Sequence, residues 1–186
     1  MDFNRYISAA EFAPLAELFR REGESLFVPK DGCFSFQQVR NRRSGLVEEG
    51  AFRYVHATEA GERHVVGYAF AGEFVGDYIS MCVDAPSQVT IGAMCGAEAL
   101  LVPGERLETF YRTDAACERL GRRLAEHMLA EVYERLLDRY AASPQQRYEA
   151  LTERCPDVLQ LVPLRELASY LGVRPETLSR IRRRVR

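Results

Sequence analysis

The sequence predicts an α+β protein built from three parts: a roll of short β-strands, a long helix and a C-terminal helix-turn-helix. Three observations predict this order. Short apolar runs separated by glycines fill residues 26–102, a run without proline covers residues 113–140, and two short amphipathic segments flank Gly172. Runs of the first kind are typical of strands and the other two of helices. The expected parts are residues 1–111, 112–142 and 143–186.

The first part is expected to begin with a short amphipathic helix over residues 8–22 and to continue as the roll. The apolar residues that share one face of this helix are Phe12, Leu15, Leu18 and Phe19. The expected strands are Leu26–Pro29, Gly45–Glu48, Phe52–Ala57, His64–Phe70, Val89–Ala93 and Ala97–Val102. Many short strands at close spacing favour a small β-barrel or roll.

The second part is a long helix from Thr113 to Tyr140, in which Gly121 is the only glycine. Its apolar residues cover a stripe that is too wide for one partner surface. One side is therefore expected to lie on the roll and another on a symmetry mate, as in a coiled-coil dimer. We assign the dimer contact to Leu120, Leu124 and Met128. The alternative is a helix that covers only its own roll.

The third part opens with Ser143-Pro-Gln-Gln146, which combines a helix cap, a proline at the first helical position and a glutamine three residues after the cap. A new helix and a domain boundary are predicted here. The residues expected to form the core beneath the helix-turn-helix are Tyr148, Leu151, Val158, Leu159 and Leu161.

Two amphipathic segments joined by a glycine then predict the helix-turn-helix itself. The first has apolar residues at Leu164, Leu167, Ala168 and Leu171, the spacing of one helical face. Gly172 follows where a helix end favours the left-handed conformation, and Pro175 can open a new helix. The second helix has its own buried stripe at Leu178, Ile181 and Val185.

The outward residues of the second helix predict DNA binding. The first turn of a recognition helix meets base edges, Arg is the usual bidentate partner of guanine, and Glu can accept from the cytosine amino group. We expect Glu176 and Arg180 to read bases, and Thr177 and Ser179 to contact bases or phosphates. The residues expected on phosphates are Arg174, Arg182, Arg183 and Arg184. The alternative is an ordinary helical hairpin with a solvated, charged face.

The uneven distribution of charge along the sequence favours DNA binding by the C-terminal part. From Ser143 onward there are nine arginines against five acidic residues, whereas the preceding residues hold 16 basic and 22 acidic ones. The five cysteines are widely spaced and form no CxxC pair, which favours free thiols. The N-terminal Met1–Tyr6 lacks the basic and apolar regions of a signal peptide, and no apolar run approaches a membrane span. We expect a cytoplasmic protein.

Five stretches resemble segments of one known protein family: Gly45–Tyr54, Phe70–Asp77, Arg147–Pro156, Leu167–Gly172 and Thr177–Ile181. The first resembles the strand and glycine turn of the catabolite activator and fumarate–nitrate regulator (Crp/Fnr) family, the second the start of its phosphate-binding cassette, and the others its DNA-binding domain. The resemblance implies a cyclic-nucleotide-binding-like roll (a double-stranded β-helix) and a bacterial homodimer that regulates transcription from a palindromic operator. The implied partners are double-stranded DNA, a second copy of the chain, RNA polymerase and an unidentified small-molecule effector.

Two departures from the family pattern bear on this function. Members that bind cyclic nucleotides carry Arg followed by Ser or Thr late in the cassette, where this chain has Ser87 or Gln88. Without that guanidinium a cyclic phosphate loses a charge-assisted pair of hydrogen bonds, so we do not expect cAMP to bind. No β-hairpin wing is expected between the recognition helix and Arg186, so the sequence resembles the wingless, short-tailed branch of the family. The candidate effector pocket is Gly72, Glu73, Phe74, Val75, Ser87, Gln88 and Val89.

The different-class alternatives are a cupin-like metal-binding enzyme and a haem-based gas sensor on the same roll. The histidines are His56, His64 and His127, and no HxH pair with a following Glu occurs. A metal site needs three or four converging ligands. No Ser-His-Asp order, phosphate-binding glycine loop or nucleophile elbow is present either. We therefore predict no enzyme activity, no catalytic or metal-binding residues and no cofactor.

Overall fold

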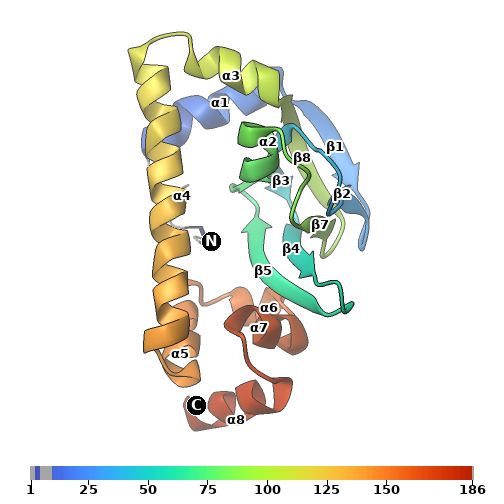
Figure 1. Cartoon of the computed structure of the whole chain (residues 1–186), viewed down its shortest axis with the longest axis vertical. Coiled ribbons are helices and arrows are strands. Elements are labelled where there is room, and N and C mark those ends of the chain that lie inside the picture. The colour runs from blue at the N-terminus through green and yellow to red at the C-terminus, as the bar shows by residue number, and fades with distance from the viewer. Residues whose placement is uncertain (1–2, 5–9, 186) are drawn as a thin grey trace.

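The protein was analysed as a computed structural model, which describes residues 3–4 and 10–185. Residues 8 and 9, the predicted start of the first helix, and Arg186 lie outside the described residues. Figure 1 shows a β-roll, a long helix (α4, Ala115–Ala141) along one side of it, and a group of short helices beneath both. The predicted α+β class and the order of its parts are confirmed.

The roll consists of two antiparallel four-stranded sheets. In the first sheet the order is β1 (Glu24–Val28), β8 (Ala97–Pro103), β3 (Arg43–Glu49) and β6 (Phe74–Val75). In the second it is β2 (Cys33–Ser35), β7 (Thr90–Ala93), β4 (Ala51–Ala57) and β5 (Arg63–Phe70). The six predicted strands are confirmed within a few residues. The strands β2 and β6 were missed, since three and two residues are too few to show an alternating pattern.

The roll encloses its own apolar core. Residues that alternate along the strands of both sheets pack together there, and the fully buried ones are Phe52, Ala69, Ile91, Ala93 and Ala99. The turn between β3 and β4 needs a glycine. Gly50 has φ 81°, and a Cβ at this position would lie 2.6 Å from the carbonyl oxygen of Gly96.

Within the part of the chain that the structure describes, a 3₁₀ turn and three short helices accompany the roll. A 3₁₀ turn, Ala10–Phe12, leads into α1 (Ala13–Glu22), which lies within the predicted range of 8–22. The helices α2 (Tyr78–Val83) and α3 (Gly104–Tyr111) were not predicted. The first has only six residues. The second follows β8 directly, and its apolar residues Leu107, Phe110 and Tyr111 span little more than one turn, which is too short to separate a helix from the preceding strand.

The long helix α4 begins two residues after the predicted start, because Asp114 caps it. The Asp114 carboxylate accepts hydrogen bonds of 2.8 Å from the backbone N–H groups of both Ala116 and Cys117. These hydrogen bonds lower the pKa of Asp114, first from Cys117 and then from Ala116. The helix then runs to Ala141 without interruption, as predicted.

The two halves of α4 differ in what they touch, which bears on the residues predicted for the dimer contact. Leu120 and Leu124 are each only 8% exposed and pack with α1, α3 and the roll, while Met128 is partly buried beside them. These residues belong to the core of their own chain and leave little surface for a symmetry mate. The apolar residues that α4 exposes lie further along, between 47% and 85% exposed: Leu129, Val132, Tyr133, Leu136, Leu137 and Tyr140. We call this set the α4 stripe.

The C-terminal segment folds into four helices: α5 (Pro144–Arg154), α6 (Val158–Leu161), α7 (Leu164–Leu171) and α8 (Pro175–Val185). The predicted capping box at the start of α5 is confirmed. The backbone N–H of Gln146 donates to the Ser143 hydroxyl over 3.3 Å, and the backbone N–H of Ser143 donates to the Gln146 side chain over 2.9 Å.

Replacing Ser143 by alanine is expected to lower the free energy of unfolding by about 1 kcal/mol, because a backbone N–H at the start of α5 loses its acceptor. Urea denaturation of the full chain measures the change. Ser143→Asp is the matched control and should retain most of the stability, since its carboxylate can also cap. Equal losses in both variants would contradict the role given to the hydroxyl.

The core beneath the helix-turn-helix is shared with the roll. Tyr148, Leu151 and Val158 are buried as predicted, and Leu159 is partly buried. The prediction for Leu161 is wrong: it is 49% exposed, because α6 is a single turn and directs this residue outward. The same cluster continues into residues of β4 and β5, so the C-terminal helices rest on the second sheet.

Candidate functional site

The first candidate site is the helix-turn-helix formed by α7 and α8. Gly172 ends α7 in the left-handed conformation with φ 67°, and the backbone N–H of Val173 donates to the carbonyl of Ala168 over 2.9 Å. A Cβ at Gly172 would lie 2.9 Å from the Arg139 guanidinium, the flexible end of a side chain that can move aside, so the left-handed backbone is what favours glycine here. Pro175 is the first residue of α8, as predicted.

The two helices pack as their apolar patterns predict. Leu167, Ala168 and Leu171 of α7 are buried, and so are Leu178 and Ile181 of α8. Val185 differs from its prediction, because it is 43% exposed in the last turn of α8. The small side chain of Ala168 is fully buried where α7 enters the core.

The face of α8 turned away from this core carries the residues predicted to read DNA. Glu176, Arg180 and Arg183 follow one another at i, i+4 and i+7, and all three are exposed. Arg174 and Arg184 are exposed as well, while Thr177, Ser179 and Arg182 are half-buried at the flanks. The Arg180 guanidinium lies 3.5 Å from the Thr177 hydroxyl. The structure therefore leaves a continuous polar ridge along α8.

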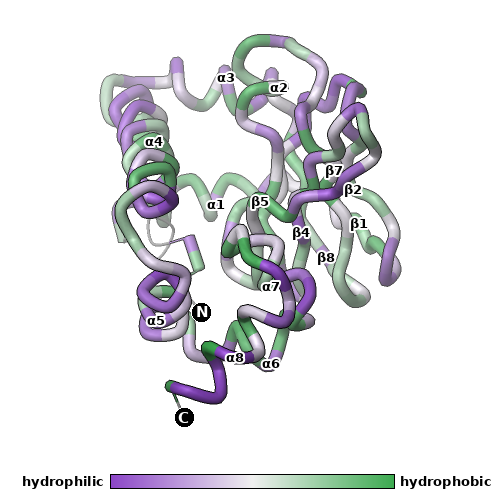
Figure 2. Tube along the Cα trace, turned by 60° about the horizontal axis from the view of Figure 1, so that its bottom comes forward, coloured by the Kyte–Doolittle hydropathy of each residue, from purple (hydrophilic) through white to green (hydrophobic). Residues whose placement is uncertain are grey.

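The ridge is strongly basic. Residues 174–185 contain five arginines and a single acid, Glu176. Figure 2 shows the last turns of α8 as mostly hydrophilic, in contrast to the apolar segments that surround its start. Glu176 lies in the first turn and three arginines in the last, which suits the helix dipole at both ends.

The helix-turn-helix contacts the roll of its own chain through side chains of α7, which meet residues of β4 and β5. The Ser169 hydroxyl accepts a 2.9 Å hydrogen bond from the backbone N–H of Val65. Arg53 donates to Glu166 over 2.8 Å, and both side chains are only 22% exposed. Tyr170 packs against Tyr68 with 5.6 Å between the ring centroids. The sequence shows no sign of these contacts, since each joins residues more than 100 positions apart.

The second candidate site is a cavity of about 270 Å³ between the roll, α1, α3 and α4. Of the seven residues predicted for the effector pocket, Phe74 and Val75 line it. Apolar residues that join them include Leu15, Phe19, Val66, Met81, Leu107, Leu124, Met128 and Val132. The tyrosines Tyr54, Tyr68, Tyr78 and Tyr111 also line it. They come from four separate elements, so no local pattern in the sequence indicates that they meet.

Glu73, one of the predicted pocket residues, is buried and forms hydrogen bonds within the roll and does not line the cavity. It is 2% exposed and accepts hydrogen bonds from the backbone and side-chain N–H groups of Asn4, at 2.8 and 2.7 Å. It also accepts one of 3.1 Å from the backbone N–H of Phe70. Burial raises the pKa of the Glu73 carboxyl, and these hydrogen bonds oppose the shift. Gly72 forms the adjacent turn with φ 86°.

Ser87, Gln88 and Val89 also lie outside the cavity lining. The Ser87 hydroxyl is fully buried, 2.5 Å from the Asp77 carboxylate, which in turn caps α2. The backbone carbonyl of Gln88 lies 2.7 Å from Nδ1 of His56. The prediction that these residues line the pocket differs from the structure, because hydrogen bonds within the roll hold them away from the cavity.

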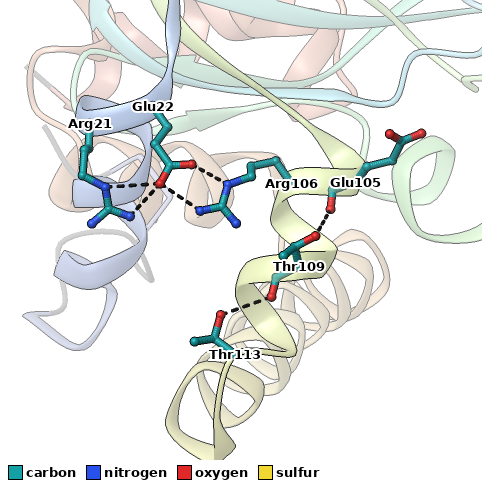
Figure 3. A network of polar contacts seen from close by, with 6 residues as sticks. All are labelled: Arg21, Glu22, Glu105, Arg106, Thr109 and Thr113. Atoms are coloured by element: carbon teal, nitrogen blue, oxygen red, sulfur yellow. Dashed lines mark hydrogen bonds and ion pairs between the residues drawn. The ribbon is translucent and has the colours of Figure 1, made fainter.

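Two of the helices that line the cavity, α1 and α3, are joined at one end by a network of ion pairs. Figure 3 shows Arg106 of α3 and Arg21 of α1 both directed at the Glu22 carboxylate. Hydrogen bonds from Arg106 first, and then from Arg21, lower the pKa of Glu22 to about 2. Since all three side chains are solvated, the network contributes more to the alignment of α1 and α3 than to stability.

The residues considered as metal ligands are placed as follows. His56 and His64 face each other directly on β4 and β5, the neighbouring strands that the sequence predicts. Among residues 3–4 and 10–185, no group of three or more His, Cys, Asp or Glu side chains is arranged to hold a metal ion. All five cysteines are free. Within the same residues, no helix combines the length and apolar character that crossing a membrane requires.

No family model matches the sequence, and no curated protein matches it either. Solved structures do match. FixK2 from Bradyrhizobium japonicum gives a TM-score of 0.73 at 17% identity, over 88% of this chain and 84% of that one. CLP, the c-di-GMP-responsive global regulator of Xanthomonas campestris, gives 0.65 at 17%, over 93% and 91%. The catabolite activator protein of Thermus thermophilus gives 0.60 at 19%, over 94% and 85%. The resemblance found in the sequence is thus confirmed at the level of the fold.

Proposed function

We propose that this protein is a transcription regulator of the Crp/Fnr type that binds a palindromic operator as a homodimer. The observation that carries the proposal is the exposed ridge of α8, in which Glu176, Arg180 and Arg183 stand in a row on a supported helix-turn-helix. Such a row fits the major groove, where an Arg and a Glu can discriminate base pairs. The shared fold supports the proposal, since one matching structure is a catabolite activator and another a global regulator of virulence gene expression.

The α4 stripe supports the homodimer. Its six apolar residues lie on one side of the helix and are all at least 47% exposed, which is unusual for a monomeric protein. Two copies of α4 packed along this stripe would bury it and bring two recognition helices into one molecule, as an operator with half-sites about one turn of DNA apart requires. RNA polymerase is a further proposed partner, on the family resemblance alone.

Selection of binding sites from random DNA with the full chain tests this function. We expect a two-fold symmetric sequence whose half-sites are centred about 10 base pairs, or a multiple of that spacing, apart. Enrichment of an asymmetric single site would contradict the homodimer. The absence of any enriched sequence would contradict sequence-specific binding altogether.

Arg183→Ala is expected to weaken binding to all DNA sequences alike, because this side chain is assigned to a phosphate. The slope of the logarithm of affinity against the logarithm of salt concentration should become shallower by about 1 per subunit. Fluorescence anisotropy at several salt concentrations measures it. Arg20→Ala removes the same charge from an exposed position of α1 and is the matched control. A loss confined to one base position would contradict the phosphate role.

A further inference from the structure

Phe3 and Asn4 lie in the domain interface, by which we mean the contact of β4 and β5 with the C-terminal helices α5, α7 and α8. Neither residue belongs to a helix or a strand, yet Phe3 is fully buried. The centroid of its ring lies 5.4 Å from that of Tyr68 and 5.6 Å from that of Phe70, both on β5. It also lies 5.4 Å from the ring centroid of Tyr170 on α7. One aromatic side chain therefore contacts both parts of the chain at once.

A cation also meets the Phe3 ring. The Arg154 guanidinium of α5 lies 5.3 Å from the ring centroid, within the range of a cation–π contact. The same guanidinium is 3.9 Å from the Glu131 carboxylate of α4, and the Arg154 side chain is only 15% exposed. Phe3 is thereby linked to the long helix as well as to β5, α5 and α7.

Asn4 is held by the buried carboxylate of Glu73. The backbone N–H of Asn4 donates to one carboxylate oxygen and its side-chain amide to the other. The same amide donates to the carbonyl oxygen of Tyr68 over 3.0 Å. A buried carboxylate is costly unless hydrogen bonds replace its water, and Asn4 supplies two such bonds to Glu73 from 69 positions away in the sequence. The arrangement suits an asparagine, whose two N–H groups reach both oxygens.

The position of α7 in the domain interface determines where the recognition helix stands. Only the three residues Gly172–Arg174 connect α7 to α8, so a displacement of α7 moves α8 with it. In the structure, α7 is packed on the roll and the ridge of α8 is exposed. An operator with two half-sites requires both recognition helices at a fixed position relative to α4. The apparent affinity for it falls with the fraction of molecules that hold this position.

We propose that the domain interface is a binding site for the chain's own Phe3–Asn4 pair, and that occupancy of this site holds the recognition helix in the position that reads an operator. The site is selective for an aromatic residue followed by asparagine, because aromatic rings and a guanidinium surround the first and a carboxylate receives the second. The inference deepens the proposed function and rests on it in one respect, the effect on operator binding. Occupancy of the site is measurable without DNA.

Differential scanning calorimetry of the full chain tests whether the two parts unfold together. We expect one transition for the unchanged protein, since the roll and the C-terminal helices share one apolar cluster. Asn4→Asp places a second carboxylate against Glu73, and Phe3→Ala removes the ring. Each change should split the unfolding into two transitions. Phe27→Ala, which removes the same ring from a 65% exposed position on β1, is the matched control and should keep one transition.

Fluorescence anisotropy with the selected operator measures the consequence for DNA binding. Asn4→Asp and Phe3→Ala should each bind at least about tenfold more weakly, because fewer molecules hold α8 in the required position. The base preference within each half-site should stay unchanged, since the residues of α8 are intact. Phe27→Ala should bind like the unchanged chain. Circular dichroism checks that all variants fold.

A second change at Glu73 separates the specific contact from a general loss of stability. In Asn4→Asp combined with Glu73→Gln, the glutamine amide can donate to the new carboxylate. The double variant should therefore regain a single transition and bind the operator more tightly than Asn4→Asp alone. Two unrelated losses of stability would add instead, and a double variant weaker than both single ones would contradict the contact.

The outcomes separate this proposal from the regulator proposal. A single transition in both Asn4→Asp and Phe3→Ala would overturn the site, because the pair would then only add stability. Tighter operator binding by either variant would overturn its role, since the empty site would be the binding form. If two transitions appear but no operator is selected, the regulator proposal falls and the site remains. If both variants bind a selected operator unchanged, the regulator proposal stands and the role of the site falls.

Discussion

Replacing Leu129 and Leu136 together by aspartate is expected to leave the chain monomeric and to reduce its affinity for the selected operator by roughly 1,000-fold or more. Both residues belong to the α4 stripe and are exposed in the single chain, so four carboxylates would meet at the dimer contact. A monomer reaches only one half-site, which brings its affinity toward that of non-specific binding. Sedimentation velocity and anisotropy on the same samples measure the two effects.

Two further variants make this result specific. Leu129→Met with Leu136→Met keeps an apolar surface of similar volume and should keep the dimer. Leu124→Ala, in contrast, should lower the free energy of unfolding by about 2–5 kcal/mol, because this residue is buried within its own chain. If Leu124→Ala gave a stable monomer while the aspartate variant stayed dimeric, the dimer contact would lie at Leu120, Leu124 and Met128, as the sequence predicts, and not at the α4 stripe.

Arg180→Ala should cost about 1–3 kcal/mol of specific binding for each half-site and relax the preference at one base position in each. The reason is that Arg180 stands in the middle of the exposed row on α8, one turn after Glu176, where a guanidinium can form two hydrogen bonds to guanine. Binding-site selection repeated with the variant shows the lost position, and anisotropy gives the affinity.

Replacing Arg180 by lysine distinguishes the contribution of its charge from that of its planar guanidinium. Arg180→Lys keeps the positive charge but lacks the planar fork, so it should lose most of the base preference while the salt dependence stays unchanged. Arg183→Ala should show the opposite pattern. An unchanged base preference in Arg180→Ala would exclude this residue from base recognition.

The C-terminal part could be predicted closely from the sequence because its signals are local. Ser143, Gly172 and Pro175 each determine a helix end within a few residues, and the structure shows each of them in that role. The β-roll was predicted as a class for the same reason. Its short members β2 and β6 and the helices α2 and α3 were missed, because packing rather than a repeating pattern determines them.

The errors concern surfaces whose partner is distant in sequence. The apolar residues of α4 form two stripes, and nothing in their spacing shows which one meets the roll. Leu120 and Leu124 lie on the stripe that packs within its own chain, while their predicted role in a dimer stays a prediction. The predicted pocket residues lie in the segment that resembles the start of a phosphate-binding cassette and in the stretch where the family's arginine is expected. In the structure Glu73 and Ser87 are engaged by Asn4 and Asp77, and the cavity is lined by tyrosines from elsewhere.

The hydrogen bond between β5 and α7 offers a way to observe whether the helix-turn-helix stays packed on the roll. The amide of Val65 is satisfied by the hydroxyl of Ser169 rather than by a neighbouring strand, so its deuterium uptake depends on whether the two parts stay together. In solution, slow exchange at this one amide means that the helix-turn-helix is packed on the roll, and fast exchange means that it has separated from the roll. The exchange rate at Val65, compared with and without operator, therefore reports how readily the two parts separate, on a chain that carries no added label.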